Sequence, residues 1–289
     1  MNRAIRRFVG SLNGPKKYLF FLGLLLICIV CLCLGIYAQF FYKYSDTDMF
    51  MIGINIGSQK TAEEISLLKA NFNSLYTDSI LINSENVRTE KIEPSKELVY
   101  TGYSFDNNDE NFYNVSAHIP VLNINTDVAK KINADIKTEF YDKANLVMRS
   151  SKGHTVYNVN YAAFVNEDVL SVTIKASLKE DNKAEKVTVR TYTYSISEQR
   201  EVSLQELIKL KGTTEDTVQK TIRDDIQVAY TNAKLIASEY GNLYERNVNE
   251  DEYKIENSKE YFLTQDGYVY VVYAYGNKDY TNEMDIVIF

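Results

Sequence analysis

The chain has 289 residues, of which 45% are hydrophobic and 25% are charged, and its formal net charge at pH 7 is −7. An acidic surface repels nucleic-acid phosphates, so the charge balance excludes nucleic-acid binding from the expected functions. With 23 tyrosines and 13 phenylalanines, the composition is that of a folded protein and not of a low-complexity stalk.

The first long apolar segment, Tyr18–Phe41, contains no charged residue. It exceeds the roughly 20 apolar residues that a helix needs to cross a bilayer, whereas the apolar core of a cleaved signal has about 7–15. Cys28, Cys31 and Cys33 lie in this segment and leave a lipoprotein signal as an alternative, but each follows a large aliphatic residue. The sequence therefore predicts one retained transmembrane helix over residues 18–41.

The charges around this segment predict its orientation. Five basic residues and no acidic one precede it: Arg3, Arg6, Arg7, Lys16 and Lys17. The positive-inside rule makes residues 1–17 a cytoplasmic tail and places the C-terminal part outside a single-pass cell membrane protein. Subtracting those five from 32 Lys and Arg leaves 27 against 39 Asp and Glu, so the extracellular part carries a charge of about −12.

Residues 42–96 are expected to form a juxtamembrane connector that contains one helix over about 61–76. Thr61 with Glu64 three residues later has the pattern of a capping box. The apolar residues that follow at helical spacing are Ile65, Leu68, Phe72 and Leu75.

Residues 97–182 are expected to form a first α+β half. Strands are predicted from Leu98, over Phe112–Leu122, over Thr155–Phe164 and over Val169–Leu178, with a polar loop at Asp106–Glu110. Pro120 indicates an edge strand or a strand end. Between these strands, Asn125 and Thr126 offer helix caps. The predicted helix that follows has one apolar face, which consists of Val128, Ile132, Ile136 and Phe140.

Residues 183–289 are expected to form a second α+β half. It contains strands over Lys186–Ile196 and Met284–Phe289, a helical turn at Ser203–Leu207, and a long helix from Thr213 or Thr214 to about Glu239. The segment Tyr261–Tyr275 is interrupted by a turn at Gln265–Gly267, and both faces of the strand beyond that turn are apolar, which predicts a central strand. The fold class is therefore α+β, with antiparallel sheets packed against helices and preceded by the transmembrane helix.

The order of these pieces resembles the paired uncharacterised extracytoplasmic domains of lysozyme-sensing anti-sigma-V factors and of some peptidoglycan deacetylases. The matching pieces are Ile119–Leu122, Ile132–Ile136, Leu170–Val172, Val202–Leu207, Phe262–Thr264 and Gly267–Tyr270. The resemblance covers roughly Glu97–Phe289 and implies an α+β fold and binding to the cell wall. It includes neither a sigma-binding segment nor a deacetylase catalytic domain.

The sequence points to no catalytic residue, metal site or cofactor. His118 and His154 stand apart without a zinc-ligand motif, and no Gly-x-Ser-x-Gly elbow is present. Asp106–Glu110 and Asn249–Glu252 offer oxygen ligands for calcium but lack the EF-hand spacing, so solvated acidic turns are the expected reading.

The tyrosines on two predicted strands are the candidate binding residues, together with the polar segment Tyr275–Glu283. The candidates are Tyr192, Tyr194, Tyr268, Tyr270, Tyr273, Tyr275 and Asn277. Two readings stay open: packing within the sheet, because tyrosine favours strands and buries a large ring, or an aromatic platform for a sugar or a protein.

The expected function is a non-enzymatic, membrane-anchored binding or sensing module of a bacterial cell envelope. The partners that the resemblance implies are peptidoglycan or a secreted cationic protein such as lysozyme. Two alternatives remain: a hydrolase of cell-wall glycan or peptide, and a structural partner of another membrane protein that contacts Cys28 and Gly35 in the span.

Overall fold

The computed structural model describes residues 56–82, 89–150, 153–240 and 243–289. The predicted tail over residues 1–17 and the predicted span over residues 18–41 lie outside these ranges. Within the described ranges, no helix is both long and apolar enough to cross a bilayer. Residues 1–63 and 64–289 form two separate units, and the architecture below is that of residues 64–289.

A seven-stranded sheet extends through both predicted halves. Its strands are β1 (Ser79–Ile82), β2 (Val99–Asp109), β3 (Tyr113–Leu122), β4 (Thr155–Asn166), β5 (Val169–Glu180), β6 (Lys186–Ser195) and β7 (Arg200–Glu201). The order is β2-β3-β4-β5-β6-β7, and β1 pairs with β4. Because β5 and β6 pair from Val169–Ser195 to Leu178–Lys186, the expected boundary between residues 182 and 183 falls in a hairpin of one sheet.

Two strand pairings are parallel, which the prediction of antiparallel sheets did not include. β3 pairs with β4 and β1 pairs with β4 in the parallel sense, and the other pairings are antiparallel. After β3 the chain forms α5 (Asp127–Ile136), a π-helical turn η2 (Lys137–Tyr141) and α6 (Asp142–Ser150). A helical crossover returns the chain to the end of the sheet from which it came, so the next strand adds in parallel.

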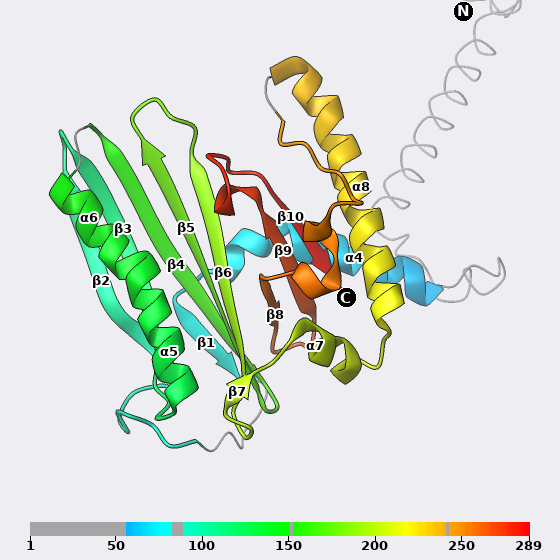
Figure 1. The fold of residues 1–289 in the computed structure, drawn as a ribbon, viewed down its shortest axis with the longest axis horizontal. Helices are drawn as coiled ribbons and strands as arrows, with labels where there is room; N and C mark the ends of the chain where they lie inside the picture. The colour runs from blue at the N-terminus through cyan, green and yellow to red at the C-terminus, as the bar shows by residue number, and fades with distance from the viewer. Residues whose placement is uncertain (1–55, 83–88, 151–152, 241–242) are drawn as a thin grey trace, which may run out of the picture. The chain divides into compact units, whose positions relative to one another are not determined.

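α5 and α6 cover one face of the large sheet (Figure 1). The predicted cap is confirmed, because the Thr126 side chain accepts a hydrogen bond from the amide of Ala129. Ile132, Ile136 and Phe140 are buried as expected, and they pack against β3, β4 and β5 in one apolar cluster. β6 contributes Tyr194 to the same cluster, so its tyrosines face the helices.

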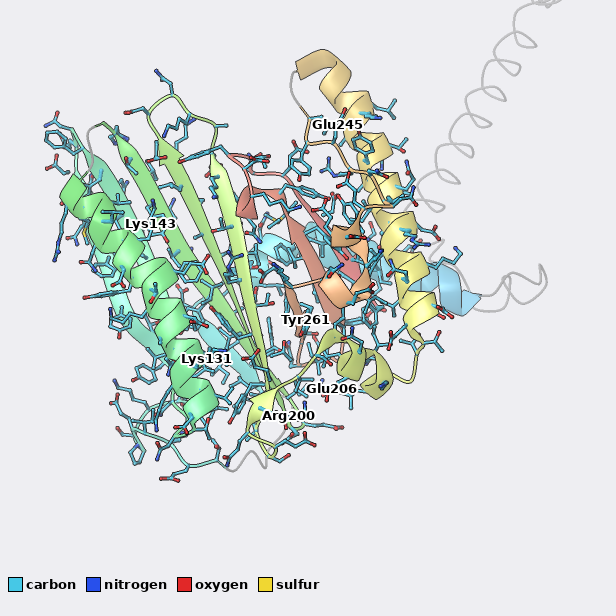
Figure 2. All side chains as sticks on the ribbon, viewed as in Figure 1. Lys131, Lys143, Arg200, Glu206, Glu245 and Tyr261 are labelled. Atoms are coloured by element: carbon cyan, nitrogen blue, oxygen red, sulfur yellow. The ribbon has the colours of Figure 1, made fainter. Side chains whose placement is uncertain are left out.

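The other face of the large sheet packs against a three-stranded antiparallel sheet. This small sheet consists of β8 (Tyr261–Leu263), β9 (Val269–Ala274) and β10 (Met284–Ile288), with β9 in the centre as predicted. Phe262 lies between the two sheets, stacked on Phe164 with ring centroids 5.6 Å apart and on Tyr270 at 4.8 Å. Side chains fill the space between the sheets (Figure 2). Every residue of β9 is buried, because one face of the strand packs on the large sheet and the other packs in the cluster that includes α7 and α8.

Two helices pack on the outer side of the small sheet. α7 (Leu204–Leu210) begins with a complete capping box between Ser203 and Glu206. α8 (Glu215–Tyr240) buries Val218, Ile222 and Ile226 in one apolar cluster with residues of β9 and β10. Three short 3-10 helices complete the chain: η3 (Asp251–Tyr253), η4 (Ile255–Asn257) and η5 (Tyr275–Asn277).

Two elements differ from their predicted bounds. Within the described ranges the chain begins with α4 (Ile56–Ala70), followed by the 3-10 helix η1 (Phe72–Leu75), in place of the predicted helix over 61–76. Phe72 is buried against the small sheet and β1 pairs with β4, so residues 64–82, which we expected in a connector, are part of the folded unit. The expected loop Asp106–Glu110 is instead mostly strand, since β2 continues to Asp109.

Candidate functional site

The candidate tyrosines do not share one exposed face. Tyr192 and Tyr194 lie on the helix-covered side of β6, and Tyr194 is fully buried. Tyr270, Tyr273 and Tyr275 are buried in or beside β9. Tyr192 on β6 and Tyr268, which directly precedes β9, are half-exposed. The burial of four of the six rings favours the packing reading, and it directs the search for a site to the segment that follows β9.

Asn277 completes the open edge of β6. Its amide nitrogen donates to the Val189 carbonyl oxygen at 3.2 Å, and its amide oxygen accepts from the Val189 amide at 3.0 Å. This pair of hydrogen bonds imitates a neighbouring strand, which leaves no unpaired backbone group at Val189. Further along the same segment, the Thr281 carbonyl accepts from the amide of Val187. Residues 275–283, here called the 275–283 loop, are therefore fixed along the edge of the large sheet.

The base of the 275–283 loop is anchored by a buried ion pair. Arg246 Nε lies 2.6 Å from Asp285 Oδ2, and the two side chains are only 3% and 7% exposed. Arg246 Nη2 also pairs with Glu283 at 3.0 Å. The hydroxyl of Tyr275 donates to the same Asp285 oxygen at 2.6 Å and is 3.1 Å from the hydroxyl of Tyr253. Tyr275 thus acts as an anchor of the loop.

Three clefts adjoin the 275–283 loop. The charged cleft, of about 700 Å³, is lined by Arg190, Asp251, Glu252, Asn257–Glu260, Val272–Tyr275, Asn277 and Lys278. The acidic cleft, of about 430 Å³, is lined by Ala184, Glu185, Leu243, Tyr244 and Asp279–Glu283. The asparagine cleft, of about 340 Å³, is lined by Asn73, Tyr76, Asn158, Asn160, Lys175, Ser177, Glu185, Val187, Asn282 and Met284.

Most charged groups of the charged cleft are already paired, although the exposed Lys259 forms no ion pair with a described residue. Arg190 donates to Glu139 at 2.8 Å and to Glu260 at 3.0 Å, and Glu260 also accepts from the amide of Thr191 at 2.8 Å. Burial raises the pKa of Glu260, although Arg190 opposes that shift. Burial likewise raises the pKa of Tyr273 to about 12, and its hydroxyl bonds to Ser258. These contacts join the two sheets and the helix layer, so we assign them a structural role.

The acidic cleft differs from the charged cleft in that its lining carries an excess of negative charge. Three of its lining residues are acidic, Glu185, Asp279 and Glu283, and none of the lining residues in the described part of the chain is Lys or Arg. Glu283 is held by Arg246, whereas the carboxylates of Glu185 and Asp279 form no ion pair with a described residue. Two tyrosines add aromatic surface, of which Tyr280 is 44% exposed. This arrangement can accept a cationic side chain.

The two histidines do not come together. His154 directly precedes Thr155, which pairs with Tyr113 in the parallel register of β3 and β4. At about 3.3 Å per residue, His118 lies roughly 20 Å further along the sheet than His154. Ser116 donates to Asp106 and not to His118, and His118 lines none of the three clefts. Among the described residues, no three His, Cys, Asp or Glu side chains are grouped to hold a metal ion.

His118 gives the fold a pH-dependent contact between β1 and β3. Its Nδ1 lies 2.7 Å from Asp78, and Nε2 lies 3.5 Å from Asp106. The hydrogen bond to Asp78 raises the pKa of His118 above 6.5, with Asp106 adding to the effect. A raised folded-state pKa gives stability that is fully present below the unfolded pKa and is lost as pH rises through the folded value.

We therefore expect an NMR titration to give His118 a pKa above 6.5. Asp78→Asn should lower the His118 pKa toward 6.5. The thermal unfolding midpoint of the wild type should exceed that of His118→Gln at low pH. This difference in midpoint should shrink as pH rises from about 6.5 through the pKa of His118 in the folded protein. An unchanged His118 pKa in the Asp78 variant would contradict the assignment.

Comparison with known proteins finds distant similarity to solved structures. No family model matches the chain, and no curated protein matches it. Among solved structures, the chain is similar to a DUF3298 family protein from Pseudomonas aeruginosa PAO1, with 9% sequence identity, a TM-score of 0.39, and coverage of 71% of this chain and 91% of that one. It is also similar to a DUF3298 family member from Bacteroides fragilis NCTC 9343, with 8% identity, a TM-score of 0.34, and coverage of 61% and 79%.

Proposed function

We propose that this chain is a non-enzymatic, membrane-anchored binding module of a bacterial cell envelope, and that its partner is a secreted cationic protein such as lysozyme. The observation that carries the proposal is the acidic cleft beside the 275–283 loop, in which Glu185 and Asp279 are left without ion-pair partners among the described residues. Loops fixed on a rigid scaffold are the usual position of binding residues.

Long-range charge supports the same partner. The sequence after the predicted span carries about 12 more acidic than basic residues, from 27 Lys and Arg against 39 Asp and Glu. Such a field raises the association rate with a cationic protein, and the acidic cleft is the site at which that protein would bind. A lysine or arginine of the partner would reach the carboxylates of Glu185 and Asp279 with its charged group. The Tyr280 ring already has Lys183 and Lys186 within 5.2 and 5.8 Å of its centroid, so the carboxylates are the groups left for the partner.

Titration of the full chain in lipid nanodiscs with lysozyme tests the proposal. Glu185→Gln with Asp279→Asn should weaken binding about tenfold, equivalent to about 1.4 kcal/mol. Glu97→Gln with Glu110→Gln makes the same change in net charge at two exposed positions elsewhere and should have little effect. Equal losses in both double variants would assign the binding to net charge alone and contradict a site in the acidic cleft.

Peptidoglycan, the other partner that the resemblance implies, forms the second arm of the same experiment. If the wild type binds insoluble peptidoglycan and does not bind lysozyme, the partner is a wall polymer and not a cationic protein. Release of soluble fragments from the peptidoglycan would support the hydrolase alternative.

A further inference from the structure

On the face of the large sheet that packs on the small sheet, the residues of β4 change from apolar to polar along the strand. Alternate residues of a strand share a face. On this face Phe164 and Ala162 are buried in the cluster between the sheets, and the next two residues are Asn160 and Asn158, which are half-exposed. Asparagine is depleted from strands, so two in succession on one face are not what strand packing favours.

Other elements bring further amide and hydroxyl groups to the same place. On β5, Lys175 lies opposite Asn160 and Ser177 lies opposite Asn158. Asn73 comes from η1, and Asn282 comes from the 275–283 loop. Four carboxamides from three separate segments therefore line the asparagine cleft of about 340 Å³.

Much of the hydrogen-bonding capacity in this cleft is unused. Asn158 forms one long contact of 3.4 Å with Ser177, and Asn73 accepts from Lys175 at 2.6 Å. Among the described residues, the side chains of Asn160 and Asn282 form no hydrogen bond. Each carboxamide offers two donors and an acceptor with two lone pairs, so the cleft presents many donors and acceptors side by side.

The charges in the asparagine cleft are balanced. Burial lowers the pKa of Lys175, and the negative charge of Glu185 opposes that shift. The ammonium group lies 5.6 Å from the centroid of the Tyr76 ring. The Tyr76 hydroxyl lies 3.1 Å from that of Thr173, which fixes the ring. A cleft with one cation, one anion and four neutral amides favours a neutral polar ligand over a phosphate or a cation.

We propose that the asparagine cleft binds a carbohydrate of one or two sugar rings. Each hydroxyl of a sugar both donates and accepts, as each carboxamide does, so Asn158 and Asn160 can each pair with neighbouring hydroxyls. The volume is at the lower end of the roughly 300–1,000 Å³ usual for small-ligand sites. The cleft shares Glu185 and Asn282 with the acidic cleft, but the inference does not depend on a cationic protein partner.

Saturation-transfer difference NMR tests the inference with the full chain in lipid nanodiscs and three probes: tetra-N-acetylchitotetraose, cellotetraose and maltotetraose. We expect transfer to at least one probe in the wild type and a loss of affinity of about tenfold or more in Asn158→Ala with Asn160→Ala. The matched control is Asn108→Ala with Asn114→Ala, a cross-strand pair of exposed asparagines on β2 and β3, which should bind as the wild type does.

Absence of transfer to all three probes at millimolar concentration would overturn the inference, as would full binding by the Asn158/Asn160 variant. If the Asn158/Asn160 variant shows no thermal unfolding transition, it is not folded, and Asn282→Ala is used in its place. Asn282→Ala should weaken carbohydrate binding about threefold, and unchanged binding by this variant would contradict the site. Lysozyme binding by the Asn158/Asn160 variant should equal that of the wild type. The carbohydrate site and the cationic partner can therefore fail separately.

Discussion

Arg246→Met should destabilise the protein by about 3–5 kcal/mol, because it leaves the Asp285 carboxylate buried without its cation. Arg246 is the central residue of the buried network, since it pairs with Asp285 and Glu283 and its guanidinium lies 4.7 Å from the centroid of the Tyr275 ring. Urea unfolding of the full chain in nanodiscs, followed by circular dichroism, measures the change.

An exposed arginine provides the matched control for this experiment. Arg200 also pairs with two carboxylates, Glu198 and Glu206, but its side chain is 47% exposed; Figure 2 shows it beside Glu206 near the start of α7. Arg200→Met should cost less than about 1 kcal/mol. Adding Asp285→Asn to Arg246→Met should recover part of the loss, because the uncompensated charge is removed. An Arg246 variant as stable as the Arg200 variant would contradict the assignment of the network.

Gly276→Ala should displace the 275–283 loop and destabilise the protein by about 1–3 kcal/mol or more. A Cβ atom added at Gly276 would lie closer than 3.0 Å to the carbonyl oxygens of Val187 and Thr281. Both are backbone atoms, and the Thr281 carbonyl accepts the hydrogen bond from the Val187 amide that joins the loop to β6, so relief of the clash would disturb that contact. Differential scanning calorimetry and a lysozyme titration of the same sample measure stability and binding together.

Asp279→Ala, in the same loop, separates the two effects. Asp279 is exposed and lines the acidic cleft. It should weaken lysozyme binding while leaving the thermal midpoint within about 1 °C, because surface substitutions away from special features change stability by about 0.5 kcal/mol or less. A Gly276 variant with wild-type stability and wild-type binding would show that the loop does not need its close approach to β6.

Local patterns predicted most of the secondary structure. The cap at Thr126, the turn before β9 and the buried faces of α5 and α8 depend on residues near one another in sequence, so spacing alone was sufficient. The class of the fold, α+β with mainly antiparallel sheets, follows from the order of these elements. The parallel pairing of β3 with β4 could also have been inferred, because a helix lies between the two strands.

What sequence reasoning missed depends on contacts between distant segments. Arg246 and Asp285 are 39 residues apart, and Lys69 and Asp225 are 156 apart; no periodicity reveals such pairs. Residues 42–96 were predicted to be a connector, whereas Phe72 is buried against the small sheet and β1 pairs with β4, two contacts with segments far away in the sequence. A second overlooked signal was Asn158 and Asn160, two asparagines at alternate positions of a predicted strand.

The same distinction applies to the candidate site. Tyrosine enrichment predicted the strands that carry the rings but not which face each ring would occupy. Tyr194 and Tyr270 turned out to fill the core on opposite sides of the large sheet. The 275–283 loop, selected for its polarity next to a Tyr-rich strand, does adjoin all three clefts.

The titration of the full chain with lysozyme tests the central claim most directly. We predict saturable binding that weakens steeply as salt rises, because surface charges are screened within about 10 Å at 0.1 M ionic strength, and that weakens about tenfold in the Glu185/Asp279 variant. No binding at low salt, or binding that neither salt nor that variant changes, would contradict the account.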